Sequence, residues 1–241
     1  MKTLKKLLIV AVGLFGISNA HAQLELEVNQ ELEQNTKLLV KQLDEISEER
    51  KSELTEIGNF LVNQLEEKDA FSALFVCTHN SRRSHISDVW FKYALLFYGV
   101  EGLESFSGGT EATAFNPHAI AALERAGFTI HYNKNVDNPV VSVTPGKYPV
   151  WKMKSKVYTH KINPTSDFAA IMVCSDADKS CPVVSGATGR FSLPFKDPRY
   201  YDGTPSQDLK YDETVQEIGK EMFFLADHIK SQLIIKKEIL K

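Results

Sequence analysis

The feature that most constrains the fold is a cysteine at the end of a short apolar run. The run Ala73-Leu74-Phe75-Val76 has the character of a buried strand, and it leads directly into Cys77-Thr78-His79-Asn80-Ser81-Arg82-Arg83-Ser84. A helical pattern begins at about Ser84. A strand, a polar loop and a helix in this order indicate a parallel α/β sheet, with the loop at the carboxyl end of its strand.

The loop has the composition of a site for a tetrahedral oxyanion. Arg83 follows Cys77 by six residues, and its planar guanidinium suits phosphate or arsenate. The N–H groups of the loop and of the helix N-terminus should converge on the same point. This positive field favours the thiolate, so we expect Cys77 to be a nucleophile. The remaining members of the predicted oxyanion loop are Thr78, His79, Asn80, Ser81, Arg82 and Ser84.

Residues 1–22 are predicted to be a secretory signal peptide. Three lysines precede an apolar stretch from Leu7 to Ile17, and Ala20-His21-Ala22 supplies the small-x-small pattern for a cut after Ala22. An uncleaved anchor is the alternative, although this stretch is short for a bilayer. We therefore expect a periplasmic or secreted protein.

Removal of the signal peptide would change the net charge of the chain, and export would change the expected chemical state of the cysteines. Removing residues 1–22 takes away three lysines and no acidic residue, so the net charge falls from −3 to −6 and argues against a nucleic-acid partner. The remaining 219 of the 241 residues can bury a core without disulfides. All three cysteines remain, and an odd number in an exported chain leaves at least one thiol free or reactive.

Residues 23–69 are predicted to form an amphipathic helical extension. Residues 24–69 contain no proline and one glycine, Gly58, while leucine and isoleucine recur mainly every three or four residues. One interpretation is a helical hairpin or collar packed on the next domain. The alternative is a coiled coil that makes the protein a homodimer through these helices.

Residues 70–241 alternate strand and helix signals and are predicted to form one catalytic domain. The expected fold is a doubly wound, four-stranded parallel sheet with helices on both faces. The predicted strands are Ser72–Val76, Leu103–Ser107, a short one near Phe128–His131, and Phe168–Cys174. The predicted helices run from Ser84 to about Tyr98, over Pro117–Ala126 with Asn116 as cap, and from Glu213 to about Gln232.

Residues 138–160 depart from this alternation. Apolar residues alternate over Asn138–Thr144 and again over Tyr148–Lys154, on either side of Pro145-Gly146-Lys147. This pattern predicts an inserted β-hairpin. It would either cover the edge of the sheet or form a flap that faces the substrate.

Two further groups of residues bear on the chemistry. Cys174 and Cys181 are separated by six residues, just after a predicted strand. Asp197 precedes Pro198, which fixes a turn and holds the aspartate in a loop. With Cys77 and Arg83 they form a set comprising a nucleophile, an oxyanion clamp, a pair of redox thiols and an acid.

Residues from about Phe75 to Lys230 resemble the low-molecular-weight tyrosine phosphatase superfamily, and within it the thioredoxin-coupled arsenate reductases. The loop resembles their Cys-Thr-Gly-Asn-Ser-x-Arg-Ser pattern, with His79 in the place of the glycine. Phe106-Ser107-Gly108-Gly109 and Asn116-Pro117-His118-Ala119-Ile120 resemble the segments that follow it. Cys174-Ser175-Asp176-Ala177-Asp178, with Cys181-Pro182, resembles the second and third redox cysteines of the reductases.

The resemblance implies arsenate reduction. Cys77 would attack arsenate, Arg83 would stabilise its charge and Asp197 would protonate the departing oxygen. Cys174 and Cys181 would then pass a disulfide outward to a thioredoxin-like reductant. We expect no cofactor, and no metal site either, because the histidines show no metal-ligand spacing.

Two alternatives remain. A phosphate monoester phosphatase would form a phosphocysteine at Cys77, and Cys174 and Cys181 would be a structural disulfide, natural outside the cytoplasm. Tyr200 and Tyr201 resemble the aromatic pair with which phosphatases stack a phosphotyrosine ring, so they are predicted to face the substrate. The second alternative is an oxyanion-binding module without catalysis.

Overall fold

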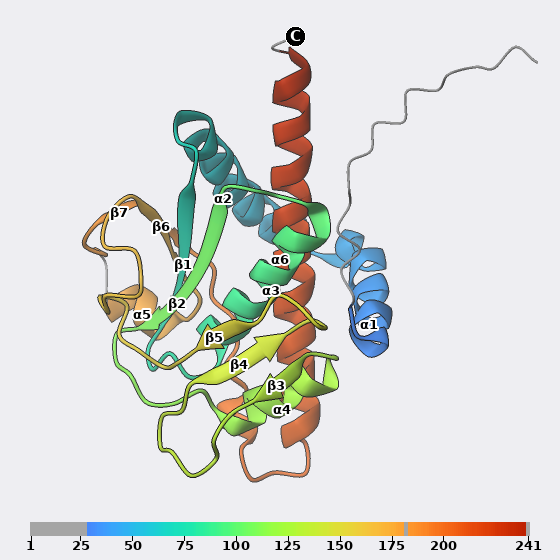
Figure 1. Cartoon of the computed structure of the whole chain (residues 1–241), viewed down its shortest axis with the longest axis vertical. Coiled ribbons are helices and arrows are strands. Elements are labelled where there is room, and N and C mark those ends of the chain that lie inside the picture. Colours follow the sequence, from blue (N-terminus) through green and yellow to red (C-terminus); the bar gives the residue numbers. More distant parts are fainter. Residues whose placement is uncertain (1–27, 181–182, 240–241) are drawn as a thin grey trace, which may run out of the picture.

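Two β-sheets form the framework of the protein (Figure 1). The computed structural model describes residues 28–180 and 183–239, so the predicted signal peptide and Cys181 lie outside the described residues. The larger sheet has the order β2-β1-β6-β7, and all three of its pairings are parallel. Its strands are β1 (Phe71–Cys77), β2 (Leu103–Gly109), β6 (Phe168–Met172) and β7 (Ala187–Ser192). The predicted four-stranded parallel sheet flanked by helices is confirmed.

One strand of this sheet differs from the prediction. The short strand near Phe128 is present as β3 (Thr129–His131), but it belongs to the second sheet. The fourth parallel strand is β7, which carries no apolar run and lies half-exposed at the sheet edge. A buried parallel strand reads as a hydrophobic run, so an edge strand of this composition leaves little pattern to detect.

The second sheet contains the predicted hairpin. Its strands β4 (Val141–Thr144) and β5 (Trp151–Met153) pair antiparallel, with Val141 opposite Met153. Strand β3 adds to the other side of β4, which gives the order β3-β4-β5. The hairpin therefore belongs to a small sheet of its own.

Three helices follow the predicted pattern closely. Helix α3 (Arg83–Tyr98) starts in the Cys77 loop and ends at Gly99, whose φ of 61° suits glycine. Helix α4 (Pro117–Arg125) is capped as predicted, because the Asn116 side chain accepts hydrogen bonds from the next two free N–H groups. Helix α6 (Gln207–Ile239) is longer than predicted at both ends.

The N-terminal extension packs onto the domain. It comprises α1 (Gln30–Lys41), a 3₁₀ turn (Leu43–Glu45) and α2 (Glu48–Glu67). Arg50 on α2 donates from Nε to both carboxylate oxygens of the buried Glu221 on α6, at 2.9 Å each. Figure 1 shows α1 and α2 beside α6. The helices therefore form a collar on α6; the homodimer stays a prediction.

Helices α2 and α3 cover the same face of the large sheet. Phe60 on α2 packs against Phe71, and Phe91 on α3 packs against Phe75. Phe71 and Phe75 lie four residues apart on β1, so their side chains point to one face.

No helix within the described ranges is both long and apolar enough to cross a membrane.

Candidate active site

Cys77 is the last residue of β1, and its side chain is buried. Its Sγ lies 3.0 Å from Ser84 Oγ on the first turn of α3. The same hydroxyl accepts a hydrogen bond from Asn80 Nδ2 at 2.9 Å. Because Cys77 and Ser84 lie at the two ends of the loop, these contacts hold the thiol in one position at the carboxyl end of β1.

The loop backbone leaves its donors free. Within residues 28–180 and 183–239, the N–H groups of residues 78–82 donate no hydrogen bond. Its carbonyls, in contrast, are occupied: those of Cys77, Thr78 and Ser81 accept from the N–H groups of Thr110, Glu111 and Asn116. A loop whose carbonyls are tied down and whose N–H groups are free is suited to bind an anion.

The left-handed residue of the loop is Asn80, with φ of 44°. The preceding residue, His79, has no positive φ, so histidine fits where the resembling family has glycine. Gly109 at the end of β2 is required instead. A Cβ at this position would lie 2.6 Å from the Asn80 nitrogen and 2.7 Å from the Thr78 oxygen.

Arg83 and Asp197 meet although they lie far apart in the sequence. Arg83 Nη2 donates to Asp197 Oδ2 at 2.6 Å, and Nη1 donates to the Phe195 carbonyl at 2.9 Å. Both side chains are about one-tenth exposed. Asp197 also caps the 3₁₀ turn Pro198–Tyr201, because its side chain accepts from the N–H of Arg199. The structure thus brings the predicted clamp and the predicted acid together.

Arg82 takes a different direction from Arg83. It donates to the Tyr211 hydroxyl at 2.8 Å and to Asp202 at 3.2 Å, and Tyr211 donates to Asp202 in turn. Burial raises the pKa of Tyr211 to about 12, so its phenol stays protonated. The structure therefore uses Arg82 to tie the loop to α6.

Cys174 lies next to the Cys77 loop. Parallel strands β1 and β6 are neighbours, so the residues that follow them emerge at the same edge. Cys174 is fully buried, and its Sγ lies 3.5 Å from Thr78 Oγ1 and accepts from the Ala177 N–H at 3.3 Å. Cys77 and Cys174 are both free thiols. The third cysteine of the predicted relay, Cys181, is outside the described residues.

The segment after Cys174 forms a short helix, α5 (Ser175–Ser180). Asp178 holds it to β7: the carboxylate pairs with Arg190 at 2.6 Å and accepts from Ser192 Oγ at 2.9 Å. The relay interpretation needs this segment to move. The Asp178–Arg190 ion pair lies across the gap that the movement would open.

Tyr200 and Tyr201 follow Asp197 on the 3₁₀ turn, close in sequence to the predicted acid. Their side chains are 73% and 41% exposed. The Arg199 guanidinium lies over the Tyr200 ring, 5.4 Å from its centre. Both rings are accessible to a partner, and their role toward a substrate stays a prediction.

Sequence reasoning missed the segment that follows β5. Ser155 Oγ donates to the His79 carbonyl at 3.1 Å, and the Lys156 N–H donates to Asn80 Oδ1 at 2.9 Å. This segment therefore supports the left-handed turn of the loop. Nothing in its composition marks it, because the contacts join residues that are 76 positions apart.

His85 supports the loop from the buried side. It is fully buried, stacks on Phe115 at 4.1 Å, and its Nδ1 lies 3.2 Å from Ser107 Oγ on β2. Burial lowers the pKa of His85 well below its usual value of 6.5, and the charges of Lys156 and Lys92 act in the same direction. The imidazole is therefore neutral at pH 7.

No group of three or more metal-ligating side chains occurs in the described part of the chain.

These contacts define what the site can do. The end of β1 carries a buried thiol and a loop with free N–H donors, and Arg83 at the end of that loop pairs with the Asp197 carboxylate. Such a site attacks the central atom of a tetrahedral oxyanion and stabilises the charge that develops on its oxygens.

The chain is similar in sequence to known enzymes that act on tetrahedral oxyanions. Residues 72–142 match the family model described as low molecular weight phosphotyrosine protein phosphatase. Arsenate reductase 2 of Staphylococcus epidermidis is 31% identical over 132 residues, which cover 54% of this chain and 80% of that protein. An arsenate reductase of Staphylococcus aureus is 29% identical over the same length and coverage.

Two solved structures align with much of the chain. A low molecular weight protein tyrosine phosphatase from Bacillus subtilis aligns with a TM-score of 0.47 and 19% identity, covering 67% of this chain and 98% of that one. An arsenate reductase in the phosphate-binding state aligns with a TM-score of 0.41 and 17% identity, at the same coverage.

The matched family segment contains most of β1, the Cys77 loop, α3 and β2, which carry the thiol, Arg83 and the free N–H donors, whereas Cys174 and Asp197 lie beyond it. The arsenate reductase relatives extend the match over most of their own length. The chain is a cysteine-dependent oxyanion enzyme, and it belongs to the low-molecular-weight phosphotyrosine protein phosphatase family.

Proposed function

We propose that the protein reduces arsenate to arsenite with an external dithiol donor. The observation that carries this proposal is the position of Cys174. A second buried thiol lies in contact with Thr78, the residue after Cys77. A phosphatase needs only the first thiol, whereas a reductase needs a second one within reach of it.

The first step uses the Cys77 loop. The Cys77 thiolate attacks arsenic, and Arg83 with the free N–H groups of residues 78–82 takes up the charge on the arsenate oxygens. The oxyanion competes with Asp197 for the Arg83 fork, so the carboxyl is released to carry a proton. Asp197 then protonates the departing oxygen.

The second step oxidises thiols and reduces arsenic. The Cys174 thiolate attacks Cys77 Sγ, the S–As bond breaks and its electron pair leaves with arsenite, so arsenic gains two electrons. A Cys77–Cys174 disulfide results. Cys181 then attacks Cys174, which frees Cys77 and leaves a Cys174–Cys181 disulfide for the donor to reduce.

We further propose that these steps take place outside the cytoplasm, because residues 1–22 have the pattern of a signal peptide. The donor would then be a thioredoxin-like protein of that compartment. Fractionation followed by mass measurement of the N-terminus tests this: a chain starting at Gln23 in the exported fraction supports it, and a chain retaining residues 1–22 contradicts it.

Phosphate ester hydrolysis is the second candidate. The exposed Tyr200, on the 3₁₀ turn that Asp197 caps, favours it because an aryl ring could stack there. The deciding experiment gives the purified protein arsenate with a thioredoxin system and, separately, an aryl phosphate. We expect sustained arsenite formation. Rapid release of phosphate with no arsenite would replace reduction by hydrolysis.

A further inference from the structure

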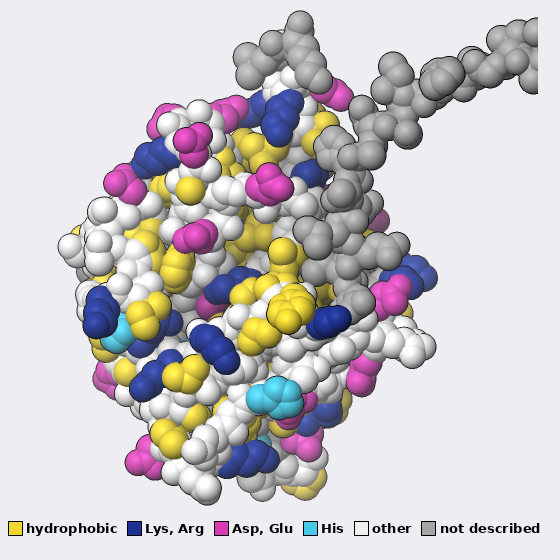
Figure 2. All heavy atoms as spheres, in the orientation of Figure 1, with side chains coloured by type: hydrophobic (Ala, Val, Ile, Leu, Met, Phe, Trp, Pro, Cys, Tyr) yellow, Lys and Arg dark blue, Asp and Glu magenta, His cyan; other side chains and the backbone are white. Residues whose placement is uncertain are grey.

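A groove separates the two sheets on the side of α3. It encloses about 460 Å³, and its walls come from α3, β2 and the hairpin strand β5. Both strands are edges: β2 ends the large sheet and β5 ends the small one. No residue of the loop 77–84 lines it, so the groove is separate from the active site. On the face drawn in Figure 2, basic side chains lie among hydrophobic ones in this area.

The groove contains more positive than negative charge at its base. The buried Asp88 carboxylate pairs with Lys92 on the same helix and accepts from Ser105 Oγ at 2.7 Å. Lys92 also donates to the Ser105 carbonyl. The single carboxylate at this point is therefore already occupied by one lysine.

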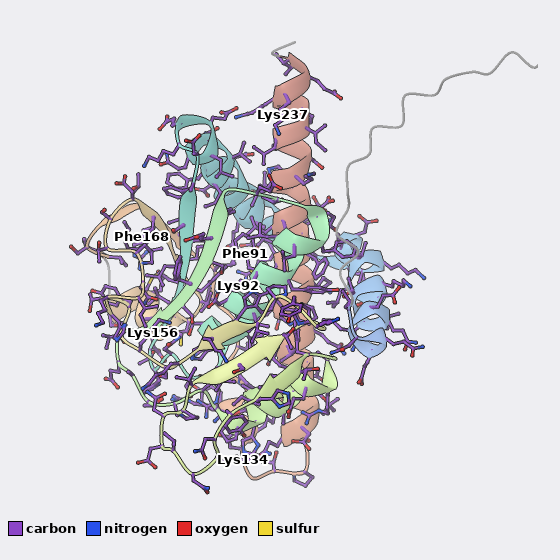
Figure 3. The ribbon with its side chains drawn as sticks, in the orientation of Figure 1. Phe91, Lys92, Lys134, Lys156, Phe168 and Lys237 are labelled. Atoms are coloured by element: carbon purple, nitrogen blue, oxygen red, sulfur yellow. The ribbon has the colours of Figure 1, made fainter. Side chains whose placement is uncertain are left out.

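Lys156 is a second lysine beside this pair, and it is half-buried. Figure 3 labels Lys92 on α3 and Lys156 after β5. Within the described ranges, the Lys156 ammonium forms no hydrogen bond and no ion pair. Burial lowers the pKa of Lys156, Lys92 adds to this effect and Asp88 opposes it. An anion that enters the groove would stabilise this half-buried ammonium group by supplying the counter-charge.

The rest of the groove is mainly apolar. Trp151 and Phe106 provide aromatic surface, and Leu96 and Ile162 are 38% and 63% exposed at its rim. A groove of this volume, with largely apolar walls and a few charged groups, matches the usual form of a small-molecule site. The charge at its base selects an anion and its walls select an apolar body.

We propose that this groove binds an amphipathic anion, an apolar chain or ring that carries one carboxylate or sulfonate, with the anionic head at Lys156 and the body along Leu96, Phe106 and Trp151. The proposal does not rest on the reaction at Cys77. Glu104 on the rim and Asp88 at the base disfavour ligands with several negative charges.

Calorimetric titration of the purified protein with sodium decanoate tests the proposal. We expect one decanoate per chain, and at least tenfold weaker binding of decanol, which has the same chain without the charge. Lys156→Gln should weaken decanoate binding at least tenfold. Lys134→Gln is the matched control, because Lys134 is exposed, lies near β3 (Figure 3) and does not line the groove; it should change binding less than twofold.

Leu96→Glu provides a second variant that is safe for folding, because Leu96 is an exposed helix residue. It should also weaken decanoate binding at least tenfold. Equal affinity for decanol and decanoate, or unchanged binding by Lys156→Gln, would overturn the proposal. So would decanoate binding that occurs only in a chain lacking residues 1–27, because the groove would then be the docking site of that segment.

Discussion

The Cys77 loop and the segment after Cys174 begin at the same edge of the sheet, yet they are held very differently. The loop is bonded to the β2–α4 connection through three of its carbonyls, to the segment after β5 through Asn80, and to α3 through Ser84. Helix α5 is six residues long and is linked to β7 through Asp178.

This difference separates the two halves of the proposed reaction. The attack on the oxyanion needs a fixed geometry, and the loop supplies it before the substrate arrives. Thiol exchange needs sulfur atoms to approach each other in turn, and a six-residue helix held to β7 by a partly exposed ion pair permits that. The rigid region therefore serves the first step and the adjustable region serves the second.

The largest effect is expected from Cys77→Ser. A hydroxyl at this position lacks the nucleophilicity of the thiolate, so arsenate reduction and aryl phosphate hydrolysis should both fall by at least about 10⁴-fold. Cys174→Ser is the matched control. It should lose sustained arsenite formation and keep aryl phosphate hydrolysis. An active Cys77→Ser protein would contradict the site assignment.

Arg83→Lys should follow with a loss of about 10²- to 10³-fold in kcat/KM, because one ammonium cannot replace the bidentate fork. Arg82→Lys is the comparison, since Arg82 bonds to Tyr211 and Asp202. It should cost less than about tenfold. Equal losses in the two variants would show that the loop does not distinguish its two arginines.

The contribution of His85, which packs behind the Cys77 loop, to the free energy of unfolding should depend on pH. His85 has a lowered pKa in the folded protein, so the unfolded chain binds the extra proton first. Its contribution to stability is complete above pH 6.5 and is lost as the pH falls below 6.5 toward the folded pKa, by at most about 1.4 kcal/mol per pH unit. Urea unfolding at pH 7.5, 6.5 and 5.5 measures it.

His85→Gln cannot gain this proton. The difference in unfolding free energy between the wild-type protein and His85→Gln should therefore shrink as the pH falls from 7.5 to 5.5. A difference that stays constant across this range would mean that the buried imidazole does not become protonated on unfolding.

The smallest effect tests the adjustable region. Asp178→Asn weakens the link between α5 and β7, and a partly exposed ion pair contributes about 0.5–1 kcal/mol. In a single turnover, formation of the Cys77–Cys174 disulfide should become two- to fivefold faster, about the rate change that this energy implies. Asp176→Asn removes the same charge from an exposed position on α5 and should leave the rate unchanged. A slower Asp178→Asn protein would show that the link positions Cys174.

The same comparison explains what could be predicted from the sequence. The strand, loop and helix around Cys77 are continuous in the chain, and the cap at Asn116 and the hairpin around Gly146 have local patterns. The edge strand β7 has no apolar run, and the contacts of Ser155 and Lys156 with the loop join distant residues. Local spacing carries no information about such contacts, so only the folded structure reveals them.

The most direct test of the central claim counts arsenite per chain in the Cys181→Ser protein with excess arsenate and an excess of the thioredoxin system. This variant keeps Cys77 and Cys174, so it should form their disulfide once and then stop, because no thiol remains to pass the disulfide outward. The account predicts about one arsenite per chain and undiminished aryl phosphate hydrolysis. Sustained arsenite formation over many turnovers would contradict the relay.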